Sequence, residues 1–248
     1  MTGAIYPSLK NRHVVITGGA SGIGAGLVVA FARQGARVTF LDILESEGHT
    51  LTESLADTPA PPVFQRCDLK NLEEVAEFFA SAGPVDVLVN NAASDDRHKL
   101  EDVTPAYWED RMAVNLRHTL FCSKAVAGDM QRRGQGVIIN FGSISWHLGL
   151  TDLVLYETAK AGIEGMTRAL ARELGPDGVR VVAIVPGNVE TPRQQRWYTP
   201  EAEAEIVASQ AIKGRIQPSD IASLVMFLAS DDARMCTGHS YWIDAGWR

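Results

Sequence analysis

Tyr156 and Lys160 stand four residues apart in the stretch "YETAK", shortly after Ser143. A spacing of i, i+4 places both side chains on one face of a helix. A cation beside a phenol favours the phenolate, so the lysine could lower the pKa of the tyrosine from its usual value of about 10. Tyr156 could then take the proton of an alcohol as a general base, while Ser143 holds the reacting oxygen. The alternative is a helix with ordinary polar residues on its surface.

A cluster of glycines supplies a second candidate site. Gly18, Gly22 and Gly24 follow the apolar run "HVVIT" and precede a helical pattern. At such a turn, backbone N–H groups and the helix N-terminus can bind a pyrophosphate. The spacing Gly-x-x-x-Gly-x-Gly is not the commonest dinucleotide fingerprint, and an ordinary strand-to-helix turn is the alternative.

Asp42 ends the next apolar run, "RVTFLD". An acidic residue at this distance from a glycine-rich turn binds the ribose hydroxyls of a dinucleotide. Its carboxylate would repel a 2′-phosphate, so NAD is favoured over NADP. The alternative is that Asp42 caps the helix that follows it.

These residues need a framework that brings them together, and the apolar pattern predicts one. Helical patterns lie at 23–35, 71–83, 105–132, 154–175 and 218–230, with Asn71 placed to cap the second of them. Strands are predicted at 13–17, 37–42, 62–68, 85–90, 136–142, 179–187 and 240–246. Apolar strands separated by helices indicate a parallel sheet covered on both faces. We therefore expect a single α/β domain over 1–248, a Rossmann-type doubly wound sheet. Its dinucleotide-binding half is expected at about 1–142 and its catalytic half at about 143–248.

Charge and composition exclude several other classes of protein. With 23 Lys and Arg against 30 Asp and Glu, the net charge is −7, which does not suit nucleic-acid binding. No apolar run reaches the roughly 18 residues of a membrane helix, and the N-terminus does not resemble a signal peptide. Cys67, Cys122 and Cys236 fit neither a disulfide framework nor a metal cluster. We expect a cytoplasmic protein that binds no metal.

The motifs together resemble the short-chain dehydrogenase/reductase family over essentially the whole length. They are "TGGASGIG", "CDL", "NNAA", "VNL", Ser143, "YETAK" and "PGNVET". The resemblance implies a catalytic tetrad of Asn115, Ser143, Tyr156 and Lys160, in which Asn115 keeps a water in place and Lys160 also grips the nicotinamide ribose. It also implies a homotetramer.

The same resemblance assigns further residues to the cofactor. Asp68 and Leu69 would meet the adenine, and Ile23 and Asn91 would line the path of the dinucleotide. Val189 and Thr191 would hold the nicotinamide carboxamide. One departure is Ala93, which stands where the family usually has glycine, and alanine resists positive φ.

Polar residues near these motifs indicate the substrate. Ser145, Trp146 and His147 follow Ser143, Asn188 follows another strand, and the loop 94–99 carries "SDDRHK". We expect them to form a polar pocket with an aromatic face, which suits a small polyol or sugar. The alternative is that Trp146 packs in the core and the loop is solvated.

Stretches outside the shared motifs, such as "DDRHKL" and "YWIDAGWR", resemble the aldose 1-dehydrogenases of this family. This resemblance implies NAD-dependent oxidation of D-xylose to D-xylono-1,5-lactone. L-arabinose as substrate, reduction of 3-oxoacyl ketones and a non-catalytic dinucleotide sensor stay open, although a sensor needs no proton acceptor. The segment with Trp197 and Tyr198 is expected to form a lid, and the tail "IDAGWR" a subunit contact.

Overall fold

The apolar runs of the sequence form one parallel sheet in the computed structural model of the chain, which describes residues 3–195 and 198–248. The sheet has seven strands in the order β3-β2-β1-β4-β5-β6-β7. The strands are β1 (His13–Thr17), β2 (Arg37–Asp42), β3 (Val63–Arg66), β4 (Val87–Asn90), β5 (Gly136–Phe141), β6 (Val179–Pro186) and β7 (Ser240–Ile243). Every pair of neighbours is parallel, so the predicted doubly wound sheet is confirmed.

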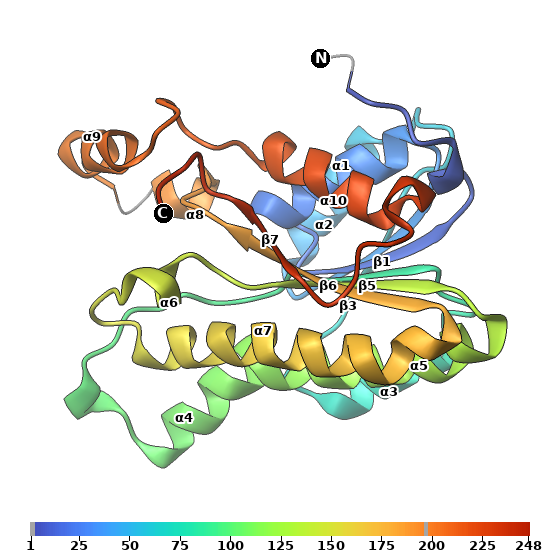
Figure 1. Cartoon of the computed structure of the whole chain (residues 1–248), viewed down its shortest axis with the longest axis horizontal. Helices are drawn as coiled ribbons and strands as arrows, with labels where there is room; N and C mark the ends of the chain where they lie inside the picture. The colour runs from blue at the N-terminus through green and yellow to red at the C-terminus, as the bar shows by residue number, and fades with distance from the viewer. Residues whose placement is uncertain (1–2, 196–197) are drawn as a thin grey trace.

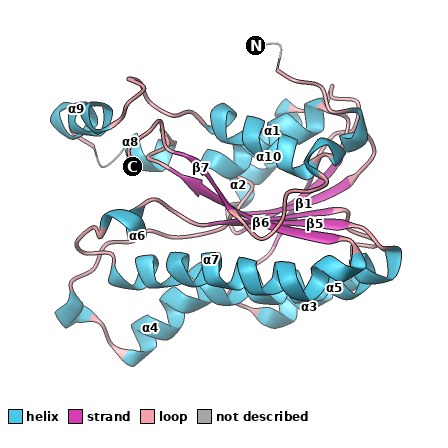
Figure 2. Cartoon of the chain, in the orientation of Figure 1, coloured by secondary structure: helices cyan, strands magenta, loops and turns pink. Residues whose placement is uncertain are grey.

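Helices cover both faces of this sheet (Figure 1). On one face lie α1 (Gly22–Arg33), α2 (Glu45–Ser54) and α10 (Pro218–Ala229). On the other lie α3 (Leu72–Ser81), α5 (His118–Arg133) and α7 (Val154–Leu174), with α4 (Pro105–Met112) beside them. Three short helices lie at one end of the sheet: α6 (Ser145–Leu148), α8 (Pro192–Gln195) and α9 (Pro200–Ser209) (Figure 2).

The central strands are apolar on both faces because both faces are covered. In β1, Val14 and Ile16 pack toward α1 and α10, whereas Val15 packs into the core under α3 and α5. All three side chains are fully buried. The edge strand β3 is largely exposed, so its sequence is more polar.

Both predicted ends of α3 are also confirmed. Asn71 accepts hydrogen bonds from the backbone N–H groups of Glu73 (3.0 Å) and Glu74 (3.5 Å), which the first turn of a helix leaves unpaired. Gly83 follows the helix with φ of +71°, a conformation that favours glycine.

The helical region predicted around 105–132 has an irregular middle. It contains a π-helical turn, Ala113–Arg117, between α4 and α5. A π-helical turn inserts one residue into a helix and is frequent at functional sites. Asn115 lies in this turn and is buried.

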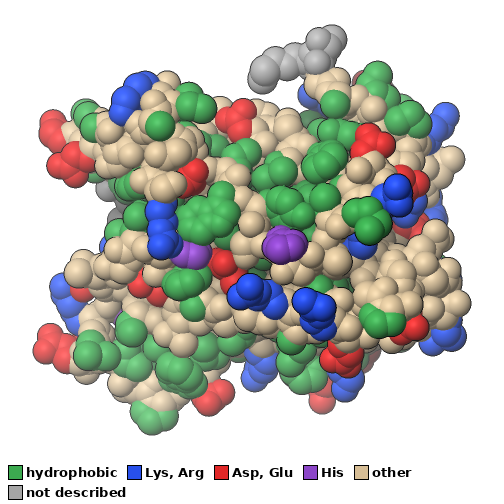
Figure 3. All heavy atoms as spheres, viewed as in Figure 1, with side chains coloured by type: hydrophobic (Ala, Val, Ile, Leu, Met, Phe, Trp, Pro, Cys, Tyr) green, Lys and Arg blue, Asp and Glu red, His purple; other side chains and the backbone are tan. Residues whose placement is uncertain are grey.

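The outer surface has two further features. Hydrophobic side chains gather over α10 and β7 on the face in Figure 3, and Lys and Arg side chains lie over α7 below them. No helix in the described ranges is both long and apolar enough to cross a membrane.

Candidate active site

The glycine-rich turn between β1 and α1 is built so that only glycine fits. Gly18 has φ of +66°, and a Cβ atom on Gly24 would lie 1.9 Å from the carbonyl oxygen of Gly18. The Asn91 amide, after β4, donates to the carbonyl oxygens of Thr17 (3.1 Å) and Gly18 (3.0 Å). This turn therefore exposes backbone without side chains at the carboxyl ends of the strands, as a pyrophosphate site requires.

Asp42 lies at the end of β2, beside this turn. Its Oδ2 accepts a hydrogen bond from the N–H of Ala20 (2.9 Å), and its Oδ1 accepts from the N–H groups of Ile43 and Leu44. Helix α2 begins at Glu45 with Leu44 as its N-cap, so Asp42 is not the capping residue. The carboxylate instead joins the glycine-rich turn to the end of β2.

A cavity of about 600 Å³ runs along the carboxyl ends of the strands, within the size range of cofactor sites. All the residues predicted to bind the cofactor line it: Gly18, Gly22, Ile23, Gly24, Asp42, Asp68, Leu69, Asn91, Tyr156, Lys160, Val189 and Thr191. A continuous cavity lined by this bare turn fits a dinucleotide. Ala93 also lines the cavity without positive φ, so its methyl group strains no backbone.

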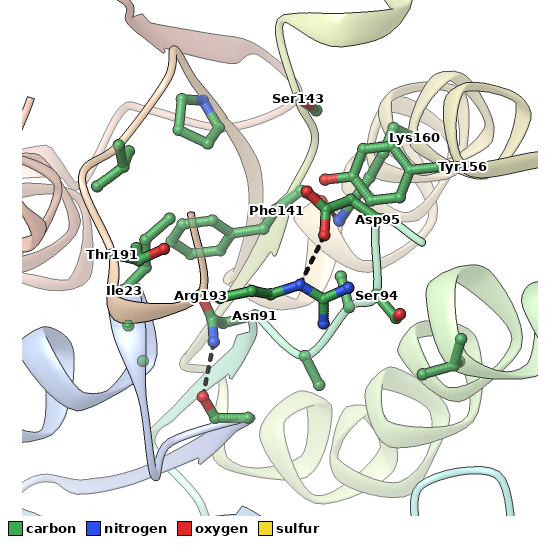
Figure 4. A pocket seen from close by; sticks show the side chains of 18 of the residues that line it. Ile23, Asn91, Ser94, Asp95, Phe141, Ser143, Tyr156, Lys160, Thr191 and Arg193 are labelled. Atoms are coloured by element: carbon green, nitrogen blue, oxygen red, sulfur yellow. Dashed lines mark hydrogen bonds and ion pairs between the residues drawn. The ribbon is translucent and has the colours of Figure 1, made fainter. Parts of the chain in front are cut away.

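Ser143, Tyr156 and Lys160 meet in this cavity (Figure 4). Helix α7 carries Tyr156 and Lys160 one turn apart, and Ser143 follows β5. The Lys160 ammonium donates to the carbonyl oxygen of Phe141 (2.7 Å) and lies 5.4 Å from the centre of the Tyr156 ring. The Ser145 hydroxyl donates to Oγ of Ser143 at 2.9 Å, which orients the serine.

Burial, rather than the lysine, controls the pKa of the tyrosine in the free chain. Burial raises the pKa of Tyr156, and the Asp95 carboxylate raises it further, while Ser143 lowers it. Burial lowers the pKa of Lys160 to about 7, and Asp95 partly opposes that shift. The predicted lowering of the Tyr156 pKa by Lys160 together with a bound nicotinamide ring stays a prediction. Tyr156 needs additional positive charge nearby before it can act as a base.

Asn115 is placed differently from the other members of the predicted tetrad. It does not line the cavity, and its amide pairs with the backbone of Ser94: the Ser94 N–H donates to Oδ1 (2.8 Å) and Nδ2 donates to the Ser94 carbonyl (3.0 Å). In the structure Asn115 thus fixes the start of the loop after β4. Its predicted water-holding role stays a prediction.

Trp146 and His147 do not line the cavity, so their predicted place in its wall is wrong. Both side chains turn toward α7 and donate to Oε1 of Glu164, from Trp146 Nε1 at 2.7 Å and from His147 Nε2 at 2.9 Å. Arg248 donates to Nδ1 of His147 (2.6 Å), which leaves the imidazole proton on Nε2. Ser240 in β7 donates to Oε2 of Glu164 (2.8 Å). These contacts join α6 to α7 and β7.

Ser145 and Asn188 do line the cavity. Nδ2 of Asn188 donates to the hydroxyl of Tyr198 (2.8 Å), and Arg215 donates to its Oδ1 (2.9 Å). Tyr198, predicted as part of a lid, therefore contacts the end of β6, whereas Trp197 lies outside the described residues.

Sequence reasoning missed several residues of the cavity. The aromatic side chain expected from Trp146 is supplied by Trp247, in the tail that was assigned to a subunit contact, and apolar lining comes from Leu148, Leu150 and Leu153. Arg193 in α8 was missed as well. Nothing in the local sequence indicated that these residues would reach the cavity.

Arg193 extends across the cavity to the loop after β4 (Figure 4). Its Nε lies 3.0 Å from Oδ1 of Asp95, and its Nη2 donates to Oδ1 of Asp96. Arg111 and Ser94 bind the other oxygen of Asp96. Although burial alone would raise the pKa of Asp96, these partners lower it.

No group of three or more His, Cys, Asp or Glu among the described residues is arranged to hold a metal ion.

Comparisons with known proteins agree with this site. A family model described as enoyl-(acyl carrier protein) reductase matches residues 18–248. The chain is 69% identical to D-xylose 1-dehydrogenase of Caulobacter vibrioides (strain NA1000 / CB15N) over 248 residues, all of both chains. It is 47% identical to a probable galactose dehydrogenase of Rhizobium meliloti (strain 1021) over 247 residues, 97% of this chain and 96% of the relative. A solved structure of a short-chain dehydrogenase/reductase family protein superposes with a TM-score of 0.88 at 31% identity, covering 96% of this chain and 98% of that one.

Proposed function

Because the chain belongs to the short-chain dehydrogenase/reductase family and is an oxidoreductase acting on CH–OH groups, we propose that it oxidises D-xylose at C1 to D-xylono-1,5-lactone. The observation that carries the proposal is the match to the Caulobacter D-xylose 1-dehydrogenase over the full length of both chains. The "DDRHKL" and "YWIDAGWR" stretches, which include Asp95 and the cavity residue Trp247, agree with it.

Family membership implies a nicotinamide dinucleotide, and we propose NAD. The ribose end of the cavity carries the Asp42 carboxylate, which favours free ribose hydroxyls and repels a 2′-phosphate. Lys160 and Thr191 would hold the nicotinamide end. When bound, the oxidised nicotinamide supplies the hydride acceptor and a positive charge near the phenol.

The reaction assigns one task to each side chain. Ser143, oriented by Ser145, hydrogen-bonds the C1 hydroxyl of the sugar. Tyr156 takes the proton of that hydroxyl as the C1 hydride leaves. Lys160, held against the carbonyl of Phe141, supports the phenolate electrostatically. Ser145 and Asn188 are proposed to bind other hydroxyls of the sugar.

The location and assembly of the enzyme are also proposals. The charge and sequence support a cytoplasmic enzyme with a small-molecule substrate. The hydrophobic side chains over α10 and β7 support a homotetramer in which the C-terminal tail lies at a subunit contact (Figure 3).

The test is the initial rate of NADH formation at about pH 8 with D-xylose, L-arabinose, D-galactose, D-glucose and D-ribose. NADP is run in parallel, and Tyr156→Phe serves as the inactive control. The highest kcat/KM with D-xylose and NAD, lost in the variant, is the expected result. A higher value with D-galactose would move the assignment toward the Rhizobium relative. No turnover with any aldose would refute it, and reduction of 3-oxoacyl ketones would be tested next.

A further inference from the structure

Two adjacent carboxylates in the loop after β4 have different surroundings. Both oxygens of Asp96 have partners: Arg193 binds Oδ1, and Arg111 and Ser94 bind Oδ2. Arg193 binds only Oδ1 of Asp95, and no described residue donates to its Oδ2. Asp96 therefore fixes the loop, whereas Asp95 keeps one oxygen available to a ligand.

The position of Asp95 is set by the rest of the loop. Asn115 binds both backbone polar groups of Ser94, immediately before it. On the other side, Nδ1 of His98 bonds to the carbonyl of Asp96, and its Nε2 accepts from the N–H of Leu155 in α7. The loop is thus attached to the helix that carries Tyr156. Asp95 lines the cavity with a carboxylate that is 43% exposed.

Asp95 lies close to the reaction centre in the cavity. In Figure 4 its carboxylate lies between Arg193 and the pair Tyr156 and Lys160. After burial, Asp95 is the next largest cause that raises the pKa of Tyr156. A carboxylate that makes the catalytic base harder to ionise slows the reaction. Fixing the loop does not require a carboxylate at this position, because Asp96 already does so.

We propose that Asp95 is a specificity-determining residue that accepts a hydrogen bond from the hydroxyl next to the reacting carbon of the substrate. The proposal rests on the proposed function, in which the C1 hydroxyl is held by Ser143 and Tyr156. An aldose has a second hydroxyl, on C2, which can donate a hydrogen bond to the carboxylate of Asp95. A simple alcohol has no such hydroxyl and cannot make this contact. Arg193 holds Oδ1 and orients the carboxylate from α8.

The requirement for this contact is measurable with matched substrates. Asp95→Ala and Asp95→Asn are compared with the unaltered enzyme on D-xylose and on its 2-deoxy analogue. Hydrogen bonds to a charged group contribute about 1.5–3 kcal/mol, which is roughly 10- to 150-fold in kcat/KM. We expect Asp95→Ala to lower kcat/KM for D-xylose by that factor and to change the value for the 2-deoxy analogue less than about threefold. In Asp95→Asn the amide oxygen would face Arg193 and the NH2 group would replace Oδ2, so we expect a loss on D-xylose close to that of Asp95→Ala.

An equal loss on both sugars would overturn the proposal, because it would mean that Asp95 acts through loop structure. An equal gain on both sugars would overturn it too, because it would mean that Asp95 acts only on the pKa of Tyr156. An unchanged KM and kcat for D-xylose in Asp95→Ala would overturn it as well. Failure of the proposed function is a separate result: the unaltered enzyme would then turn over neither sugar. Asp152→Asn, which removes a carboxylate paired with Lys99 outside the cavity, is the control for loss of negative charge.

Discussion

Replacing Glu164 by alanine is expected to cost both stability and activity. Glu164 accepts hydrogen bonds from Trp146, His147 and Ser240, and its side chain is only 13% exposed. Without it, two ring N–H groups lose their acceptor, and an unpaired buried donor costs about 1–3 kcal/mol. Trp146 is half-buried and can reach water, so we expect a total of about 2–4 kcal/mol. In a domain of this size that lowers Tm by roughly 4–15 °C.

The activity should fall because α6 begins at Ser145, which orients Ser143. A small displacement of that hydroxyl is expected to lower kcat by about tenfold or more, since misplacing reacting groups by 1 Å can cost about 100-fold. Thermal unfolding and steady-state kinetics measure the two effects. Glu164→Gln keeps Oε1 as acceptor for both rings and should cost less than about 1 kcal/mol. Glu173→Ala, an exposed position of α7, is the matched control.

Two results would refute this reasoning. If Glu164→Ala unfolds at the same temperature as the unaltered chain, the hydrogen bonds contribute nothing to stability. If Glu164→Gln is as damaging as Glu164→Ala, the charge matters and the acceptor geometry does not.

Three further predictions concern other parts of the site. Burial lowers the pKa of His118 from 6.5 to about 4. Between these two values the unfolded chain binds more protons than the folded one, so the free energy of unfolding decreases as the pH is lowered. His118→Asn should flatten the free energy of unfolding in urea against pH between 6.5 and 4, and a slope equal to that of the unaltered chain would contradict this. Asp42→Ala should lower the ratio of kcat/KM with NAD to that with NADP by about tenfold or more, and an unchanged ratio would show that Asp42 does not select the cofactor. Gly24→Ala should weaken NADH binding in a fluorescence titration by more than about tenfold, because its Cβ would overlap the Gly18 carbonyl, whereas Gly165→Ala, where the new atom meets nothing within 4 Å, should bind normally.

The sheet and the cofactor cavity could be predicted because their signals are local. A strand such as "HVVIT" is apolar along its whole length, which indicates that helices cover both faces of the sheet. The glycines of the first turn lie close together in sequence. The i, i+4 spacing of Tyr156 and Lys160 likewise needs no long-range information. These features follow from neighbouring residues alone.

The sequence did not indicate the orientation of some side chains or the contacts between residues far apart in the chain. Trp146 and His147 are adjacent to Ser143, but α6 turns by about 100° per residue and aims them at Glu164. The pairing of Asp95 with Arg193 joins residues nearly 100 positions apart, and no local pattern predicts it. Burial raises the pKa of Tyr156, and because burial depends on the whole fold, the spacing between Tyr156 and Lys160 could not indicate this effect.

The π-helical turn Ala113–Arg117 restricts how the length of this chain can change during evolution. Loss of one residue there would let α4 and α5 merge into a regular helix, and Asn115 would rotate by about 100° away from Ser94. The loop with Asp95 would then lose its anchor although no residue of the cavity had been replaced. Between the start of α4 and the end of α5, we therefore expect substitutions to be tolerated far more often than single-residue insertions or deletions.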